Sequence, residues 1–574
     1  MAMPPATPTA MPPAAPRAVP PAAPSPGPPA PALPGWKAAL AAALAVGAYA
    51  YGLDSINAPT IGDEGLYMQI ARVTAASGRW LPLVAEAGVN DTKPPLLFWQ
   101  GILSTGRGRA WDLWHLRLPV VATSLLTAAL VAWLAARIAG RTTGLRAGLV
   151  YLGFLSTIQH GRPFLTNAGE TLFLFLPLLL VHRRERTGPV LGLACGLSFG
   201  AAALFKSFFL VVPGAFALAL VLARREGWRP GAFLRRRAPF LAVASAVGLA
   251  AFALWPALDP RPDLVWSQFV VGENAGKLRF SSFASSFLTG ESAIWQTWLG
   301  PLLNAGLYLP LVAALLADLW RRRREVGADE AELWLYVLAF LVVYSFPTQR
   351  QPNYVLPTSA ALAVLLALRW DALPRLPFQV TLGLLAVAAL GVPVFAWLVE
   401  RRLGTPTIGA APFLLPAALG LLAAAGLRRP SFGREALPAL ALLALVVGSA
   451  VVAPFGRPFP EPALAEVRGR PVLAPDRFYQ SQERYRFLLS GADLRGYTCP
   501  SGPVPCPPPD PAAGVHAALL LDVGDPVPPG WEAVAERPHF KRRHSTAQIL
   551  EILGGRTELL VERLVLARPA PAPR

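Results

Sequence analysis

A charged segment interrupts an otherwise apolar chain near its N-terminus. The apolar run at 37–55 is followed by GDEGLYMQIARVTAASGRW (62–80) and NDTKPPLLFW (90–99), after which long apolar runs resume. This alternation of apolar runs with short polar connections is typical of a helical membrane protein. Charge is costly next to hydrocarbon, so the segment from 62 to 99 is the first place to look for chemistry.

The composition indicates the same class. Hydrophobic residues make up 54% of the chain, charged residues make up 15%, and the mean hydropathy is +0.43. A soluble protein of 574 residues would carry more charge to cover its surface. We therefore expect an all-α polytopic membrane protein.

The net charge of +18 raises the question of nucleic-acid binding, and the placement of the arginines answers it. Basic residues occur in short segments between apolar runs, at 183–186, 223–237 and 321–325. Such segments are typical of cytoplasmic loops, where an excess of Lys and Arg sets the orientation of the spans. We expect no nucleic-acid partner and a cytoplasmic N-terminus.

Apolar runs of helix-spanning length predict about thirteen transmembrane helices over residues 35–454. The runs are 37–55, 115–136, 144–160, 166–182, 188–205, 207–223, 238–256, 298–319, 332–347, 353–369, 377–398, 410–427 and 436–454. With the Arg-rich loops inside the cell, the loops 57–114 and 257–297 lie outside. The first run lacks the basic segment that precedes a signal peptide's apolar core, so we expect an uncleaved span.

The two ends of the chain differ from its middle. Residues 1–34 are mostly Pro and Ala, which cannot bury a core, and predict a disordered cytoplasmic tail. Residues 455–574 have ordinary polarity and predict a small mixed α/β domain on the extracytoplasmic, periplasmic side of the inner membrane. Cys499 and Cys506 lie in that domain, where an oxidising compartment would allow them to pair; two free thiols are the alternative.

A second set of ionisable residues lies at the outer ends of the predicted spans, where orientation does not explain them. The set is Asp63, Glu64, Lys93, Arg162, Glu170, Lys206, Glu273, Arg279 and Arg350. Lys206 has no charged neighbour in GAAALFKSFFLVVPG (200–214), although snorkelling of its ammonium to the headgroups is the simpler explanation for one such lysine. Cations and carboxylates together on one face predict a phosphate-binding pocket in which a carboxylate activates a nucleophile.

The order of these motifs resembles a known family. DE-x-x-Y-x-x-I-A (63–71), G-x-W (78–80) and KPPL-x-x-W (93–99) together resemble the N-terminal region of glycosyltransferase family 39. That family includes the protein O-mannosyltransferases and the bacterial aminoarabinose transferases that act on lipid A. GENAGKLRF (272–280) and YVLP (354–357) extend the resemblance, as do Glu170 and Lys206, so that it covers about residues 37–370.

The resemblance implies a GT-C fold and transfer of a sugar from a polyprenyl-phosphate donor to a glycan, lipid or protein acceptor at the outer membrane face. Asp63 would be the general base that accepts the acceptor's proton, with inversion at the anomeric carbon. Lys93, Lys206 and Arg279 would stabilise the departing lipid phosphate. The other implied substrate-binding residues are Glu64, Tyr67, Arg162, Glu170, Glu273, Arg350 and Tyr354.

Two departures from the family pattern limit what is implied. Thr92 precedes KPP, where aminoarabinose transferases usually carry an acidic residue, so that particular sugar is not predicted. Asn274 stands where some members carry a histidine, and no cluster of His, Cys and carboxylates has metal-ligand spacing. We therefore predict no cofactor. The sequence neither supports nor excludes a divalent metal.

Two other classes of protein fit part of the pattern. A transporter or flippase for lipid-linked sugars would also place cations near the membrane, but inverted repeats and charge on both faces would be expected. A membrane-anchored scaffold with an outer binding domain would leave Lys206 unexplained. The sequence favours the transferase.

Overall fold

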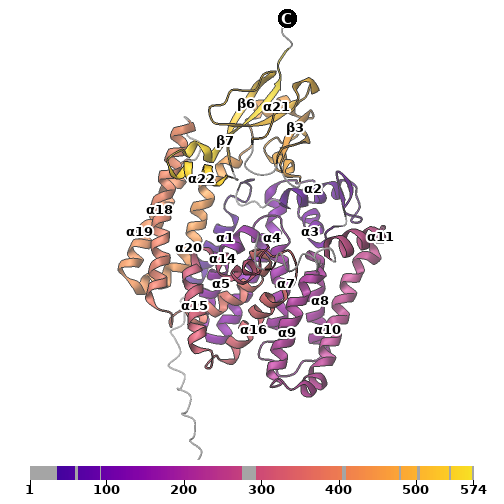
Figure 1. Ribbon diagram of the computed structural model, residues 1–574, viewed down its shortest axis with the longest axis vertical. Helices are drawn as coiled ribbons and strands as arrows, with labels where there is room; N and C mark the ends of the chain where they lie inside the picture. The colour runs from indigo at the N-terminus through magenta and orange to yellow at the C-terminus, as the bar shows by residue number, and fades with distance from the viewer. Residues whose placement is uncertain are drawn as a thin grey trace, which may run out of the picture.

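The protein consists of a large helical bundle and a small sheet domain at one end of it (Figure 1). The computed structural model describes residues 35–57, 63–90, 92–274, 287, 292–403, 409–477, 480–500, 505–541 and 544–571. The tail 1–34, for which disorder is expected, lies outside these residues, and so does Arg279.

Helices dominate the chain up to residue 456. The first half contains α1 (Gly35–Ala50), α2 (Asp63–Ala76), α3 (Leu96–Ser104), α4 (Leu113–Ala139), α5 (Arg141–Gly153), α6 (Leu155–Gly161), α7 (Asn167–Val181), α8 (Pro189–Phe205), α9 (Val211–Arg225) and α10 (Pro230–Leu258). The second half contains α11 (Pro262–Leu264), a π-helix η2 (Val265–Asn274), α13 (Ile294–Trp298), α14 (Gly300–Ala305), α15 (Leu309–Arg322), α16 (Ala328–Val343), α17 (Thr358–Arg369), α18 (Arg375–Leu403), α19 (Ala411–Arg428) and α20 (Pro430–Val452).

Each predicted apolar run coincides with helix, but not each with one uninterrupted long helix. Among the described residues, seven helical stretches are long and apolar enough to cross a membrane: Leu113–Ala139, Phe208–Arg225, Pro230–Leu258, Gly300–Arg322, Arg375–Arg401, Ala411–Arg428 and Pro430–Gly456. The other predicted runs lie on shorter helices. The run 144–160, for example, is broken where Phe154 adopts an extended conformation between α5 and α6. The chain is thus a mostly helical membrane protein, as expected.

Small residues allow α8 and α10 to pack closely. Gly192, Gly196 and Gly200 recur every fourth residue on α8 and therefore share one face. A Cβ at Gly196 would lie 2.6 Å from the carbonyl oxygen of Ala244 on α10, which is too close for any side chain. The helices touch backbone to backbone, as membrane helices with small residues at every fourth position commonly do.

The C-terminal part forms the expected mixed α/β domain. Its five-stranded sheet has the order β4-β3-β5-β7-β6, with β3 (Pro471–Asp476), β4 (Asp493–Thr498), β5 (His516–Asp522), β6 (Trp531–Phe540) and β7 (Val561–Pro569). Strands β4, β3 and β5 are parallel, and β7 pairs antiparallel with both β5 and β6. Helices α21 (Glu461–Val467) and α22 (Thr546–Leu553) and a 3-10 helix, η8 (Ser481–Phe487), complete the domain.

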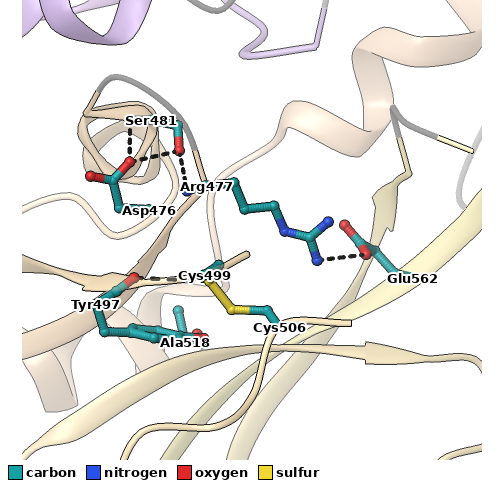
Figure 2. The surroundings of a disulfide bond; sticks show 8 residues. All are labelled: Asp476, Arg477, Ser481, Tyr497, Cys499, Cys506, Ala518 and Glu562. Carbon is teal, nitrogen blue, oxygen red and sulfur yellow. Dashed lines mark hydrogen bonds and ion pairs between the residues drawn. A yellow bond between two sulfur atoms is a disulfide. The ribbon is translucent and has the colours of Figure 1, made fainter. Parts of the chain in front are cut away.

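The two cysteines of this domain are paired. Cys499 follows β4 directly, and its disulfide with Cys506 closes the proline-rich loop that begins there (Figure 2). Nearby, the hydroxyl of Tyr497 donates to the carbonyl oxygen of Ala518 at 3.1 Å, and burial raises the pKa of that hydroxyl. Of the two outcomes that the sequence leaves open, the structure shows the disulfide.

Helix α2 lies between the bundle and the sheet domain (Figure 1). One apolar cluster joins residues of α2 and α3 to residues of the C-terminal domain: Tyr67, Met68, Ile70, Leu97, Phe98, Leu464, Val467, Val472, Leu488 and Leu494. Burial of such side chains is worth about 25 cal/mol per Å² of apolar surface, so the contact between the domains contributes substantially to stability. The helix that begins with Asp63 is therefore held from both sides.

Candidate functional site

The first turn of α2 carries two adjacent carboxylates in different surroundings. Neighbouring residues on a helix point about 100° apart, so Asp63 and Glu64 face different parts of the protein. Asp63 is exposed, and within the described structure its side chain has no hydrogen bond or ion pair. Glu64 is completely buried. Only Asp63 is open to a ligand from solution.

Glu64 forms a bidentate ion pair with Arg117 of α4. Both contacts, from Nε to Oε1 and from Nη2 to Oε2, measure 2.8 Å, and the backbone N–H of Phe164 also donates to Oε1 at 2.8 Å. The Nη1 of Arg117 donates to the carbonyl oxygens of Leu53 and Ser55 at 3.0 and 2.7 Å. The pair thus ties α2 to α4 and to the segment that follows α1, and the sequence alone did not predict the role of Arg117.

Lys206 forms an ion pair with Glu170. Its Nζ lies 3.0 Å from Oε2 of Glu170 and 5.9 Å from the ring centroid of Tyr354. Glu170 is 1% exposed, and its other oxygen, Oε1, has no hydrogen-bond partner among the described residues. The lysine is 24% exposed, so its ammonium remains accessible while Glu170 holds it in place.

Lys93 forms a second lysine–glutamate pair. Its Nζ lies 2.9 Å from Oε2 of Glu273, and both side chains are partly exposed. The two pairs are neighbours, because the Ser207 hydroxyl donates to the Asn274 side-chain oxygen, and these residues directly follow Lys206 and Glu273 in the chain. Two ammonium groups and two carboxylates are therefore brought together from four separate segments.

Tyr67 lies among these groups. Burial, and then the charges of Asp63, Glu273 and Glu170, raise the pKa of the Tyr67 hydroxyl. Tyr354 also lies within electrostatic range of Tyr67. Because Asp63 and Tyr67 are one helical turn apart on α2, the exposed carboxylate lies on the same side of the helix as the lysine–glutamate pairs. We call Asp63, Tyr67, Lys93, Glu170, Lys206, Glu273 and Tyr354 the carboxylate–lysine cluster.

Arg162 and Arg350, also expected at the site, bind nearby segments of the protein. Arg162 is 1% exposed and donates to the carbonyl oxygens of Tyr49 and Tyr51 and to the hydroxyl of Ser449. Arg350 donates to the carbonyl oxygens of Ser345 and Ser292 at 3.0 and 2.8 Å, and burial lowers its pKa. Through these hydrogen bonds, both arginines hold loops and helix ends in place.

A charged network between α2 and the sheet domain is a further feature that the sequence analysis missed. Arg72 of α2 donates to both carboxylate oxygens of Glu483 in η8, at 2.6 and 3.1 Å, and Arg486 reaches Glu483 at 3.0 Å. Glu483 is only 1% exposed. Close by, a Cβ at Gly65 would lie 2.7 Å from the carbonyl oxygen of Gln480, so glycine is needed for this close approach. The paired residues of α2 and η8 are far apart in the sequence, so no local sequence pattern predicts their contacts.

The described residues contain no group of three or more His, Cys, Asp or Glu side chains arranged to hold a metal ion.

Part of the chain is similar to a known family of proteins. A model of the dolichyl-phosphate-mannose-protein mannosyltransferase family matches residues 92–255, which include Lys93, Glu170 and Lys206. The undecaprenyl phosphate-alpha-4-amino-4-deoxy-L-arabinose arabinosyl transferases of Aeromonas salmonicida (strain A449) and Edwardsiella ictaluri (strain 93-146) are 26% and 27% identical over 316 and 321 residues. These alignments cover 53% of this chain and 55% and 54% of those proteins, so the chain spans about half the length of the curated relatives it matches.

Solved structures show the same fold over nearly the whole chain. ArnT from Cupriavidus metallidurans bound to undecaprenyl phosphate aligns with a TM-score of 0.61 and 17% identity, covering 95% of this chain and 100% of that one. The apo structure of the same protein gives 0.58 and 16%, covering 93% and 98%. The resemblance to glycosyltransferase family 39 that the sequence indicates is therefore confirmed: residues 92–255 match a model of the mannosyltransferase family, and the chain is a multi-pass integral membrane protein of ArnT-like fold.

Proposed function

We propose that the protein is a membrane glycosyltransferase that moves a sugar from a polyprenyl-phosphate donor to an acceptor hydroxyl, with inversion at the anomeric carbon. The observation that carries this proposal is the carboxylate–lysine cluster, in which an exposed carboxylate lies beside two accessible ammonium groups. The similar proteins support it, since they include an arabinosyl transferase named for an undecaprenyl phosphate-linked sugar and an ArnT whose structure holds undecaprenyl phosphate.

Asp63 is the proposed general base. Its side chain is exposed and has no partner within the described structure, so both oxygens are available to an acceptor hydroxyl. As the acceptor oxygen forms its bond to the anomeric carbon, the bond from that carbon to the phosphate oxygen breaks, and the acceptor's proton passes to Asp63. The lipid phosphate leaves with the electron pair of the broken bond.

Lys93 and Lys206 are the proposed phosphate ligands. Each ammonium keeps one glutamate partner, which fixes its position before the donor arrives. Because an ammonium has three donors, it can add a phosphate oxygen without losing the glutamate. Fixed cations of this kind stabilise the charge that develops on a leaving phosphate. Pro94 and Pro95 stiffen the chain beside Lys93.

Glu170 and the tyrosines are proposed to contact the sugar. The unpaired Oε1 of Glu170 is a buried acceptor, which is costly unless a ligand or water donates to it. A sugar hydroxyl is a suitable donor, and Tyr67 and Tyr354 offer aromatic faces close by. The proposed role of Glu64, Arg162 and Arg350 is to hold the segments around the site in place. Arg279 remains an expected phosphate ligand, and it lies outside the described residues.

We further propose the GT-C topology with about thirteen crossings, the cluster and the sheet domain on the outer side, and the N-terminus in the cytoplasm. Helices α4, α9, α15, α17 and α19 all have arginine in their last turn. Of these helices, α9 and α19 can be followed to their last turns, which lie away from the sheet domain (Figure 1). An excess of arginine at one side of the membrane marks the cytoplasmic side, so the opposite side is the outer one.

The test uses the purified full chain, radiolabelled undecaprenyl-phosphate sugars and a membrane extract as the source of acceptors. Asp63→Asn should lower the transfer of label by at least about 100-fold, the usual contribution of a general base. The matched control is Asp54→Asn, which removes an exposed carboxylate from the turn after α1 and should transfer normally. Equal transfer by both variants would refute the role of Asp63. Movement of labelled lipid across the bilayer without a glycosylated product would favour a flippase.

A further inference from the structure

A pocket of about 460 Å³ lies at the end of the bundle opposite to the carboxylate–lysine cluster. It is formed where α18 begins, α19 ends and α20 begins, and Arg375, Phe378, Gln379, Leu382, Ser431 and Arg434 contribute to its walls. The other end of α18 packs against the sheet domain through Ala396 and Val399, which places the pocket at the far end of this helix (Figure 1). The proposed transfer reaction does not use it.

The walls of the pocket are fixed by close packing. A Cβ at Gly433 of α20 would lie 2.5 Å from the carbonyl oxygen of Gly426 on α19, so the two helices meet backbone to backbone. Arg434 donates to the carbonyl oxygens of Asp371 and Leu373 at 2.9 and 3.1 Å, and its guanidinium lies 4.4 Å from the ring centroid of Phe378. A pocket bounded by such contacts is preformed, which lowers the cost of binding a ligand.

The pocket carries an excess of positive charge. Arg375 is exposed and has no ion pair or hydrogen bond within the described part of the chain. The carboxylate in the lining, Asp371, is already engaged by Arg146 at 3.1 Å. Arg434 is bound to backbone carbonyls, which do not neutralise it. Two guanidinium groups and one carboxylate therefore line the cavity, which leaves an excess of positive charge.

Hydrogen-bond donors accompany these cations. Ser431 and Gln379 line the same cavity and can both donate. Helices α18 and α20 also begin here, at Arg375 and Pro430, so the positive ends of two helix dipoles add to the potential. Planar guanidinium groups together with neutral donors suit the oxygens of a phosphate.

The surroundings of the pocket place it at a membrane boundary. Val380 and Leu384 of α18 are 43% and 47% exposed, and Leu421 of α19 is 74% exposed. These apolar side chains lie on the same helices, further along the bundle than Arg375 and Arg428. A ligand in the pocket would have its polar part among arginines and an apolar surface next to it. Basic pockets between membrane helices bind phosphate-bearing headgroups in this way.

We propose that this pocket binds the phosphate of an anionic ligand, with Arg375 and Arg434 contacting its oxygens and Ser431 and Gln379 donating hydrogen bonds. The adjoining apolar surface suits a phospholipid headgroup of the leaflet opposite to the transfer site, and a soluble phosphate offers the same chemistry. The site is separate from Asp63, and its occupancy should affect stability rather than the transfer step.

The experiment measures thermal unfolding of the delipidated full chain in detergent with phosphatidylglycerol, phosphatidylcholine or inorganic phosphate added. Native mass spectrometry counts bound lipid in the same samples. Phosphatidylglycerol should raise Tm and be retained, and phosphatidylcholine should do neither. Arg375→Ala should weaken phosphatidylglycerol binding about 10-fold, since a hydrogen bond to a charged group is lost, and Arg375→Lys should retain part of it.

Arg324→Ala is the matched control, because Arg324 is an exposed arginine from another basic segment and does not line the pocket. It should bind phosphatidylglycerol as the wild type does. A response to inorganic phosphate that Arg375→Ala abolishes would assign the site to a soluble phosphate. Absence of binding by either ligand, or equal losses in Arg375→Ala and Arg324→Ala, would overturn the proposal. Unchanged sugar transfer by Arg375→Ala would show that the variant is folded.

Discussion

Replacing Glu483 with Gln should loosen the contact between α2 and the sheet domain. Glu483 accepts hydrogen bonds from Arg72 at 2.6 and 3.1 Å and forms an ion pair with Arg486 at 3.0 Å, and it is 1% exposed. Breaking a fully buried ion pair costs about 3–5 kcal/mol. Here the two arginines are 25% and 18% exposed, and Arg72 keeps a second partner, Glu86. We therefore expect a loss of about 2 kcal/mol in the free energy of unfolding.

A double-mutant cycle measures the Arg72–Glu483 interaction itself. Arg72→Ala, Glu483→Gln and the double variant are unfolded under identical conditions in detergent, and the double variant should be less destabilised than the sum of the single changes by about 1–2 kcal/mol. The control is Glu461→Gln, which breaks a surface pair with Arg468 and should have no measurable effect. Strict additivity of the two single changes would refute the inferred coupling.

The same cycle has a consequence for catalysis. Arg72 follows Asp63 on α2 by about nine residues, or roughly 13 Å along the helix axis. A helix that is free to shift at one end carries the proposed base away from its working position, and small misplacements lower rates steeply. Glu483→Gln should therefore lower the turnover number while leaving the affinity for undecaprenyl phosphate unchanged. A change in affinity alone would contradict this reasoning.

The remaining predictions concern three positions. Arg117→Ala should destabilise the protein by about 3–5 kcal/mol, because it leaves Glu64 buried without a partner, and the double variant with Glu64→Gln should recover part of that loss in thermal unfolding. Lys206→Ala should weaken undecaprenyl phosphate binding by at least about 10-fold in a direct lipid-binding assay, whereas Lys206→Arg should preserve most of it, and equal losses would contradict a charge effect. Gly196→Val should destabilise the packing of α8 against α10 by about 1–3 kcal/mol in thermal unfolding. Gly188→Ala, at a position with no neighbouring atom within 4 Å, should not, and similar losses in both variants would argue against the close packing.

Local properties of the sequence account for the parts of the fold that were predicted. The helices could be predicted because a long apolar run is a property of consecutive residues. The break at Phe154 was not found, since the residues around it are as apolar as a continuous helix. The strand order β4-β3-β5-β7-β6 could not be predicted either, because it depends on pairing between strands that are not consecutive in the sequence.

The candidate site shows the same division. Lys206 and Lys93 are conspicuous in the sequence because each is a charged residue next to an apolar run, and the structure brings both into one cluster. The sequence does not distinguish Asp63 from Glu64, because both are carboxylates at the start of the same helix. Their side chains point in different directions on α2, so Asp63 is exposed and Glu64 is buried. Arg117 and Glu483 were missed because their partners lie 53 and 411 residues away. Such pairings exist only once the chain has folded.

The most direct test of the central claim separates binding from turnover in two variants of the carboxylate–lysine cluster. Undecaprenyl phosphate affinity and the single-turnover rate with a labelled donor are measured for Asp63→Asn and Lys93→Ala. We expect Asp63→Asn to bind the lipid normally and to lose at least about 100-fold in rate, whereas Lys93→Ala should lose at least about 10-fold in affinity. Normal turnover by Asp63→Asn, or unchanged lipid affinity in Lys93→Ala, would contradict that claim.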